Sequence, residues 1–130
     1  MKLILVDDNK EFLENLEFFI EQKLGHSVIA SYTNGMDFYK DISKFKPDII
    51  LMDISMPGAD GYTITKMVNW NNVHLKVIAV TMFTNKAYLQ KLIGAGFKGC
   101  VYKSNVFRDL PVAINEVHKG LYYWPSDIND

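Results

Sequence analysis

Four short apolar segments of this 130-residue chain each run into a polar side chain that could do chemistry. The polar groups are Asp7 and Asp8 after residues 3–6, Asp53 after residues 49–52, Thr81 after residues 76–80, and Lys103 after residues 100–102. Carboxylates gathered at one place repel each other unless a hard cation joins them, and oxygen ligands of this kind suit magnesium. A carboxylate can also accept a phosphoryl group, whose charge a metal, a lysine and a hydroxyl donor could neutralise. The set therefore indicates Mg2+-dependent phosphoryl chemistry, provided that the fold brings the segment ends together.

Asp53 stands between a buried segment and a loop. The preceding residues, Ile-Ile-Leu-Met, form a continuous apolar run, which is typical of a strand covered on both faces. The residues after it, Ile-Ser-Met-Pro-Gly-Ala-Asp-Gly61, are rich in turn formers. In an open parallel sheet, ligands bind outside the carboxyl ends of the strands. This position predicts that Asp53 is the reacting carboxylate.

The adjacent acids Asp7 and Asp8 follow the first apolar segment. One reading is that Asp7, Asp8 or Asn9 caps the next helix, since all three side chains are good N-caps. A cap accounts for only one of the two acids, and acids at the end of a buried strand are costly unless a cation or a basic group meets them. We interpret the pair as part of a cation site.

Apolar strand segments alternate with amphipathic segments along the whole chain. Helical spacing of apolar residues occurs in residues 10–23, before Pro47, after Gly61, in residues 86–95 and after Asp109. Asn85 is predicted to cap the fourth helix and Asp109 the fifth, with Pro111 in its first turn. The expected buried faces of the last two helices comprise Leu89, Leu92, Ile93, Leu110, Ala113, Ile114, Val117 and Leu121.

The alternation of five strands with five helices predicts an α/β fold with a doubly wound parallel sheet and right-handed crossovers. The expected topology is the flavodoxin-like, or CheY-like, (βα)5 arrangement with strand order 2-1-3-4-5. In that order, the four strands that end on Asp7 and Asp8, Asp53, Thr81 and Lys103 are neighbours. Their carboxyl ends would then meet in one pocket.

Composition limits the remaining possibilities. The chain is 48% hydrophobic and 22% charged, with a net charge of −1, so it has no basic excess with which to bind nucleic acid itself. A single cysteine excludes an internal disulfide framework and fits a reducing compartment. We see no secretory signal and no apolar stretch approaching the roughly 20 residues of a membrane span. A cytoplasmic location without membrane association is expected.

Several motifs together resemble a known family. They are Leu-Val-Asp7-Asp8, the segment from Asp53 to Gly61, Val-Thr81-Met-Phe, and Gly-Cys-Val-Tyr-Lys103. The ordered set closely resembles a response-regulator receiver domain of two-component systems over nearly the whole chain. Met-Pro-Gly, Thr-Met-Phe and the Lys-Ser junction are most similar to receivers of the LuxR/NarL-type subfamily.

The resemblance implies a role for each site residue. Asp53 would accept a phosphoryl group from a sensor histidine kinase or a histidine phosphotransfer protein. Asp8, Asp53 and the backbone carbonyl of Ser55 would bind Mg2+ directly, and Asp7 would assist through water. Lys103 would pair with the phosphoryl oxygens, and Thr81 would move in to bond them. Such a chain is a switch rather than an enzyme, because it catalyses only its own phosphorylation and dephosphorylation.

The resemblance also implies a domain arrangement. Residues 1–122 would form the receiver, and residues 123–130 a C-terminal tail or the start of a linker. The subfamily usually carries a DNA-binding domain after the receiver, so an output domain outside this chain would contact DNA and control transcription. A stand-alone receiver is the alternative. A phosphorylation-dependent homodimer is also a possible assembly.

Two departures from the family pattern leave a rival open. Cys100 stands where many receivers have an aromatic residue that changes rotamer on activation, and Ser104 replaces a common proline. The rival is a pseudo-receiver, a protein-binding module that works without phosphate. We further hypothesise that bulky Phe83 hinders water and lengthens the phosphorylated lifetime.

Two other classes of protein fit the sequence less well. A hydrolase of the haloacid dehalogenase type needs a second aspartate where Ser55 stands. A flavodoxin needs a Ser/Thr/Gly-rich phosphate loop after its first strand, whereas this chain has Asp7-Asp8-Asn9-Lys10 there.

Overall fold

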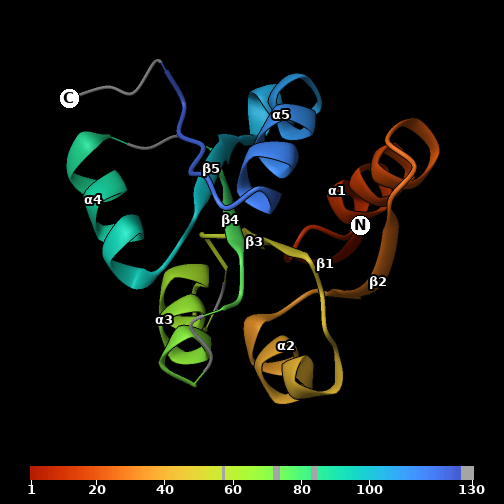
Figure 1. Ribbon diagram of the computed structural model, residues 1–130. Coiled ribbons are helices and arrows are strands. Elements are labelled where there is room, and N and C mark those ends of the chain that lie inside the picture. The colour runs from red at the N-terminus through yellow and green to blue at the C-terminus, as the bar shows by residue number, and fades with distance from the viewer. Residues whose placement is uncertain (57, 72–73, 83–84, 127–130) are drawn as a thin grey trace.

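A five-stranded parallel sheet forms the centre of the computed structural model, which describes residues 1–56, 58–71, 74–82 and 85–126 (Figure 1). The strands are β1 Lys2–Val6, β2 Ser27–Tyr32, β3 Ile49–Asp53, β4 Val77–Thr81 and β5 Gly99–Tyr102. Their order is β2-β1-β3-β4-β5, with all pairs parallel. This confirms the predicted flavodoxin-like topology, including the adjacency of the four strands that carry the candidate site.

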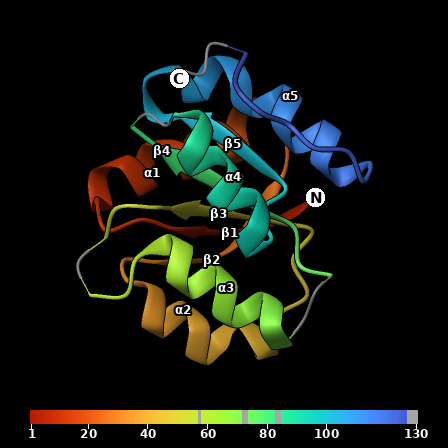
Figure 2. The same ribbon diagram turned by 90° about the vertical axis from the view of Figure 1, so that its left-hand side faces the viewer.

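Helices cover both faces of the sheet (Figures 1 and 2). They are α1 Lys10–Phe18, α2 Gly35–Asp41, α3 Gly61–Asn71, α4 Lys86–Ala95 and α5 Val106–His118. A π-helical turn, Phe19–Lys23, extends α1, and short 3-10 turns, Ile42–Lys44 and Lys103–Asn105, follow α2 and precede α5. The predicted helix over residues 10–23 is therefore one continuous helical segment.

The core has two halves, one on each side of the sheet. Leu3 and Leu5 point toward α1 and α5, whereas Ile4 and Val6 point toward the side covered by α2, α3 and α4. All four side chains are buried. This alternation explains why residues 3–6 of β1 and 49–52 of β3 are all apolar, since neither face of the strand meets water there.

Asparagine side chains begin three of the helices. The Oδ1 atom of Asn9 accepts a hydrogen bond from the Phe12 backbone N–H, at 3.0 Å, and so caps α1. Asn34 caps α2 in the same way, and Asn85 caps α4 as predicted. Because Asn9 serves as the cap, neither Asp7 nor Asp8 is needed for it.

The predicted start of the last helix is wrong. The helix α5 begins at Val106, so Asp109 lies inside its first turn and pairs with Arg108, at 2.8 Å. Pro111 is consequently within the helix rather than at its start. The reason is that the 3-10 turn after β5 leads directly into α5, so the chain already has helical geometry before it reaches Asp109. Two other expectations are also wrong, since Ile93 and Leu121 are 44% and 53% exposed.

The segment after α5 returns to the sheet. Tyr123 forms a parallel bridge with β5: its N–H donates to the Lys98 carbonyl, at 3.2 Å, and its carbonyl accepts from the Cys100 N–H, at 2.9 Å. Trp124 packs against the α2–α4 half of the core, and Pro125 is buried. The start of the predicted tail therefore contacts the outer edge of the sheet. Among the described helices, none is long and apolar enough to cross a membrane.

Candidate functional site

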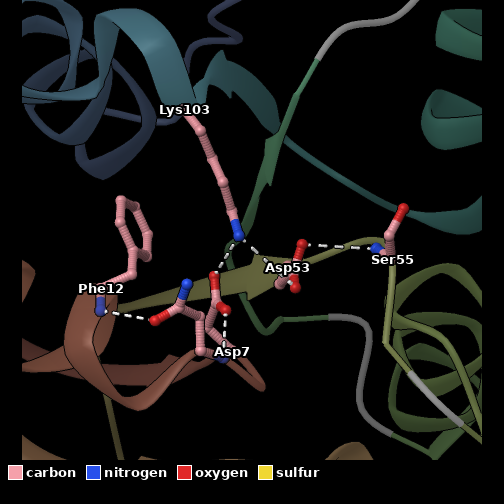
Figure 3. A network of polar contacts seen from close by, with 6 residues as sticks. Asp7, Phe12, Asp53, Ser55 and Lys103 are labelled. Atoms are coloured by element: carbon pink, nitrogen blue, oxygen red, sulfur yellow. Dashed lines mark hydrogen bonds and ion pairs between the residues drawn. The ribbon is translucent and has the colours of Figure 1, made fainter.

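Three carboxylates meet at the carboxyl ends of β1 and β3, and Figure 3 shows two of them, Asp7 and Asp53. These two strands are neighbours, with Val6 paired with Met52, so the residues that follow come out side by side. The ligand atoms of Asp7, Asp8 and Asp53 all lie within 4.8 Å of one another. Asp7 and Asp53 are buried, at 2% and 3% exposure, whereas Asp8 is exposed. The predicted acid cluster is thus present, with one of its three members open to solvent.

Lys103 reaches the cluster from the end of β5. Its Nζ atom lies 2.8 Å from Asp7 Oδ2 and 3.7 Å from Asp53 Oδ2. Its side chain is only 18% exposed, so the two ion pairs are formed mostly out of water. Thr81 ends β4, the strand between β3 and β5, and is buried. Its neighbour Val80 pairs with Asp53, which places Thr81 one residue beyond Asp53 along the sheet.

Backbone groups hold one oxygen of each buried carboxylate. The N–H of Asn9 donates to Asp7 Oδ1, at 2.8 Å, and the N–H of Ser55 donates to Asp53 Oδ1, at 3.3 Å. The Oδ2 atoms of Asp7 and Asp53 accept no hydrogen bond from the described residues, although Lys103 lies beside both. The turns after β1 and β3 therefore orient each carboxylate and leave its second oxygen directed into the site.

The electrostatics of the cluster are unbalanced. Burial, and after it the negative charge of Asp7, raise the pKa of Asp53 to about 7, although the positive charge of Lys103 acts in the opposite direction. One lysine cannot neutralise three carboxylates, so the site retains a negative charge when all three are ionised. A divalent cation would correct this deficit.

The donor set fits magnesium. Hard cations take carboxylate oxygens, and two buried carboxylate oxygens in this cluster accept no hydrogen bond within the described part of the chain. Asp7, Asp8 and Asp53 are the residues that could hold the ion. Ser55 contacts Asp53 through its N–H, and its carbonyl as a metal ligand stays a prediction.

Two contacts of the site region were not predicted from the sequence. The ring of Phe12 lies against the Lys103 ammonium, with 4.8 Å between Nζ and the ring centroid. Phe12 is one of the apolar residues at helical spacing in residues 10–23, and that pattern holds no signal for the contact. The second is the pairing of Tyr123 with Cys100, which joins residues from separate parts of the chain. The hypothesis on Phe83 concerns a residue outside those that the structure describes.

Cys100 is a packed core residue. Its side chain is fully buried within the half of the core that contains α3 and α4, as expected for cysteine in place of a larger apolar residue. Burial raises the pKa of its thiol to about 12, which keeps it neutral. The structure thus gives Cys100 a packing role on β5, the strand that leads to Lys103.

Comparison with known proteins agrees with this geometry. The model of the response regulator receiver domain family matches residues 3–115. The oxygen regulatory protein NreC of Staphylococcus aureus is 30% identical over 124 residues, which cover 95% of this chain and 57% of that protein. The chain therefore spans little more than half the length of this curated relative.

Solved structures give the same result. A two-component response regulator of the LuxR family from Aurantimonas sp. is 28% identical, with a TM-score of 0.91 over 98% of this chain and 91% of that one. The non-phosphorylated receiver domain of the stress response regulator RcsB from Escherichia coli is 27% identical, with a TM-score of 0.88 over 97% and 98%. The chain belongs to the response regulator receiver domain family, and its relatives support a LuxR/NarL-type receiver.

Proposed function

We propose that this receiver is a phosphorylation-dependent switch in which Asp53 accepts a phosphoryl group from a phosphohistidine. The donor would be a sensor histidine kinase or a histidine phosphotransfer protein. The observation that carries the proposal is the convergence of Asp53 with Asp7, Asp8 and Lys103 at one end of the sheet. In the transfer, a carboxylate oxygen of Asp53 bonds to phosphorus, the P–N bond breaks, and the histidine leaves with that electron pair.

Asp8 and Asp53, together with the backbone carbonyl of Ser55, would hold Mg2+ directly, with Asp7 acting through water. When bound, magnesium supplies positive charge that offsets the acids and the incoming phosphoryl group. The Ser55 N–H donates to Oδ1 of Asp53 and so orients its carboxylate.

Lys103 and Thr81 would bind the phosphoryl group once it is on Asp53. Lys103 already lies between Asp7 and Asp53, so it can pair with the phosphoryl oxygens after a small movement. Thr81 would donate its hydroxyl to the same oxygens. Because Thr81 ends β4 and Lys103 directly follows β5, a movement of these two residues would also move α4, β5 and α5. The negative charge added by phosphorylation of Asp53 would in this way favour a different conformation of the face formed by α4, β5 and α5.

The wider role follows from the relatives. NreC is named an oxygen regulatory protein, and one RcsB structure contains RcsB dimers bound to DNA. We infer that residues 1–122 form the receiver and that residues 123–130 lead toward an output domain outside this chain, which would contact DNA and regulate transcription. Phosphorylation would favour a homodimer. The switch would work in the cytoplasm, where a histidine kinase presents its phosphate.

The direct test is intact mass after incubation with acetyl phosphate, with and without MgCl2. Wild type should gain one phosphoryl group only with magnesium, and Asp53→Asn should gain none. Asp109→Asn is a suitable control, because it also removes one acid but lies on α5 in a pair with Arg108. Equal labelling of Asp53→Asn and wild type would contradict the proposed acceptor.

The pseudo-receiver is the second candidate, and Cys100 is the observation that favours it. A receiver without the usual aromatic residue at this position could bind partners without phosphate. If wild type takes no phosphate from acetyl phosphate or from a phosphorylated histidine kinase, while remaining folded by circular dichroism, this second function would replace the first. A stand-alone phosphorylated receiver is distinguished instead by the reading frame beyond Asp130.

A further inference from the structure

The ring of Phe12 forms a third contact for the ammonium of Lys103 (Figure 3). The distance from Nζ to the ring centroid is 4.8 Å, well within the range at which a cation is attracted to an aromatic face. The lysine side chain is mostly buried, so water screens this attraction only weakly. Asp7, Asp53 and Phe12 therefore approach the ammonium together.

The turn that positions Asp7 also positions Phe12. The N–H of Asn9 donates to Asp7 Oδ1, and the side chain of Asn9 in turn accepts a hydrogen bond from the Phe12 N–H. Phe12 is half-buried, with its remaining surface packed against the half of the core that contains α1 and α5. One N-terminal helical turn thus fixes both an acid and an aromatic ring relative to Lys103.

We propose that Phe12 is a positioning residue for phosphoryl transfer, which keeps the Lys103 ammonium in the site beside Asp7 and Asp53 through a cation–π contact. The proposal rests on the proposed function of Asp53 as phosphoacceptor. Its physical basis is that the attraction of Lys103 to the carboxylates and its attraction to the Phe12 ring respond differently to a bound metal. A divalent cation shared by Asp7, Asp8 and Asp53 reduces the negative charge that attracts Lys103, whereas the quadrupole of the Phe12 ring is unchanged.

The consequence is a division of roles. In the metal-bound site, the carboxylates would hold Lys103 less strongly, and the ring would supply the contact that prevents its flexible side chain from turning into solvent. Lys103 would then be in place when the phosphoryl oxygens arrive. Removing the ring should slow phosphorylation without changing the affinity for magnesium, since Phe12 contributes no ligand atom.

The experiment compares Phe12→Leu, which keeps an apolar side chain but removes the aromatic face, with Phe12→Trp, which keeps such a face. Phosphorylation by acetyl phosphate is followed by intact mass at saturating MgCl2, and the Kd for Mg2+ is measured separately. We expect Phe12→Leu to be phosphorylated about fivefold more slowly than wild type, Phe12→Trp within about twofold, and all three to bind Mg2+ equally. Circular dichroism and thermal melts establish that each variant is folded.

A double-mutant cycle with Lys103→Met separates positioning from a general structural effect. If Phe12 acts through Lys103, Phe12→Leu should have little further effect once Lys103→Met has removed the ammonium. An equal loss in both backgrounds, or a Phe12→Leu protein as fast as wild type, would overturn the inference. A wild-type protein that is never phosphorylated would instead overturn the proposed function itself, so the two failures are distinguishable.

Discussion

Gly61 lies so close to the backbone of Asp53 that a side chain cannot fit between them. A Cβ atom built on Gly61 would overlap the Asp53 carbonyl oxygen and lie 2.9 Å from Met52 Cγ. The Gly61 N–H also donates to the Ile54 carbonyl, at 3.1 Å, which closes the loop after β3. The first residue of α3 is therefore packed against the end of β3, and the glycine is needed for this close approach rather than for an unusual φ angle.

Replacing Gly61 with alanine should destabilise the protein by about 2–3 kcal/mol, because the backbone of β3 or α3 must move to admit the methyl group. The free energy of unfolding can be measured in urea. Gly94→Ala is the matched control. Gly94 is an exposed residue of α4, and a Cβ atom there would have no neighbour among the described residues within 4 Å outside its own helix backbone. That control should be neutral or stabilise by up to about 1 kcal/mol. Equal stability of Gly61→Ala and wild type would show that the backbone can move to admit the methyl group without cost.

The residues of the site could be predicted because each follows an apolar strand segment. Once the alternation of strands and helices indicated a parallel sheet, Asp7, Asp53, Thr81 and Lys103 had to lie at one edge. The same local reasoning misplaced Asp109, since a capping residue was recognisable but the helical turn that precedes it was not. The Tyr123–Cys100 pairing could not be predicted, because it depends on where the chain returns after α5.

The charge of Asp53 should make the protein less stable at neutral pH than it would be with a neutral side chain. Its pKa in the folded chain is about 7, compared with about 4 when unfolded. The folded state therefore binds an extra proton between these values, and the stability gained by that proton is present at low pH and lost as the pH rises through 7. Asp53→Asn should be more stable than wild type by roughly 2 kcal/mol at pH 8 without metal.

The measurement is urea unfolding of both proteins at several pH values between 4 and 8 in EDTA. The advantage of Asp53→Asn should shrink as the pH falls toward 4. A difference in the free energy of unfolding that stays constant over this range would mean that the buried charge of Asp53 does not destabilise the folded protein. Adding MgCl2 at pH 8 should stabilise wild type more than Asp53→Asn, because the variant lacks one of the proposed magnesium ligands.

Cys100 should be chemically inert in the folded protein. Its side chain is fully buried and the pKa of its thiol is raised to about 12, so almost no thiolate exists at pH 8. The reagent DTNB should label one thiol per chain in guanidinium chloride, and the native protein only at the rate of unfolding. Adding urea below the transition should increase that rate. Fast labelling of the native chain would contradict the packing of β5 against α3 and α4.

The segment after α5 should protect the outer edge of the sheet. The Cys100 N–H faces away from β4 and donates to Tyr123, whereas the Lys98 N–H donates to the Val77 carbonyl, at 2.8 Å. Ending the chain at Leu121 should therefore expose the Cys100 amide while leaving the Lys98 amide bonded. The apolar contacts of Trp124 and Pro125 would be lost as well, so the free energy of unfolding should fall by about 1–3 kcal/mol.

Amide hydrogen exchange resolved by NMR compares these two positions within one protein. In the full chain both amides should exchange slowly, and in the shortened chain Cys100 should exchange much faster while Lys98 stays protected. Protection of Cys100 in the shortened chain would show that another group covers the β5 edge. An unpaired strand edge also promotes association between sheets, so the shortened chain should dimerise or aggregate more readily, as light scattering would detect. The bridge at Tyr123 thus has a stabilising role and a protective one, which this pair of measurements separates.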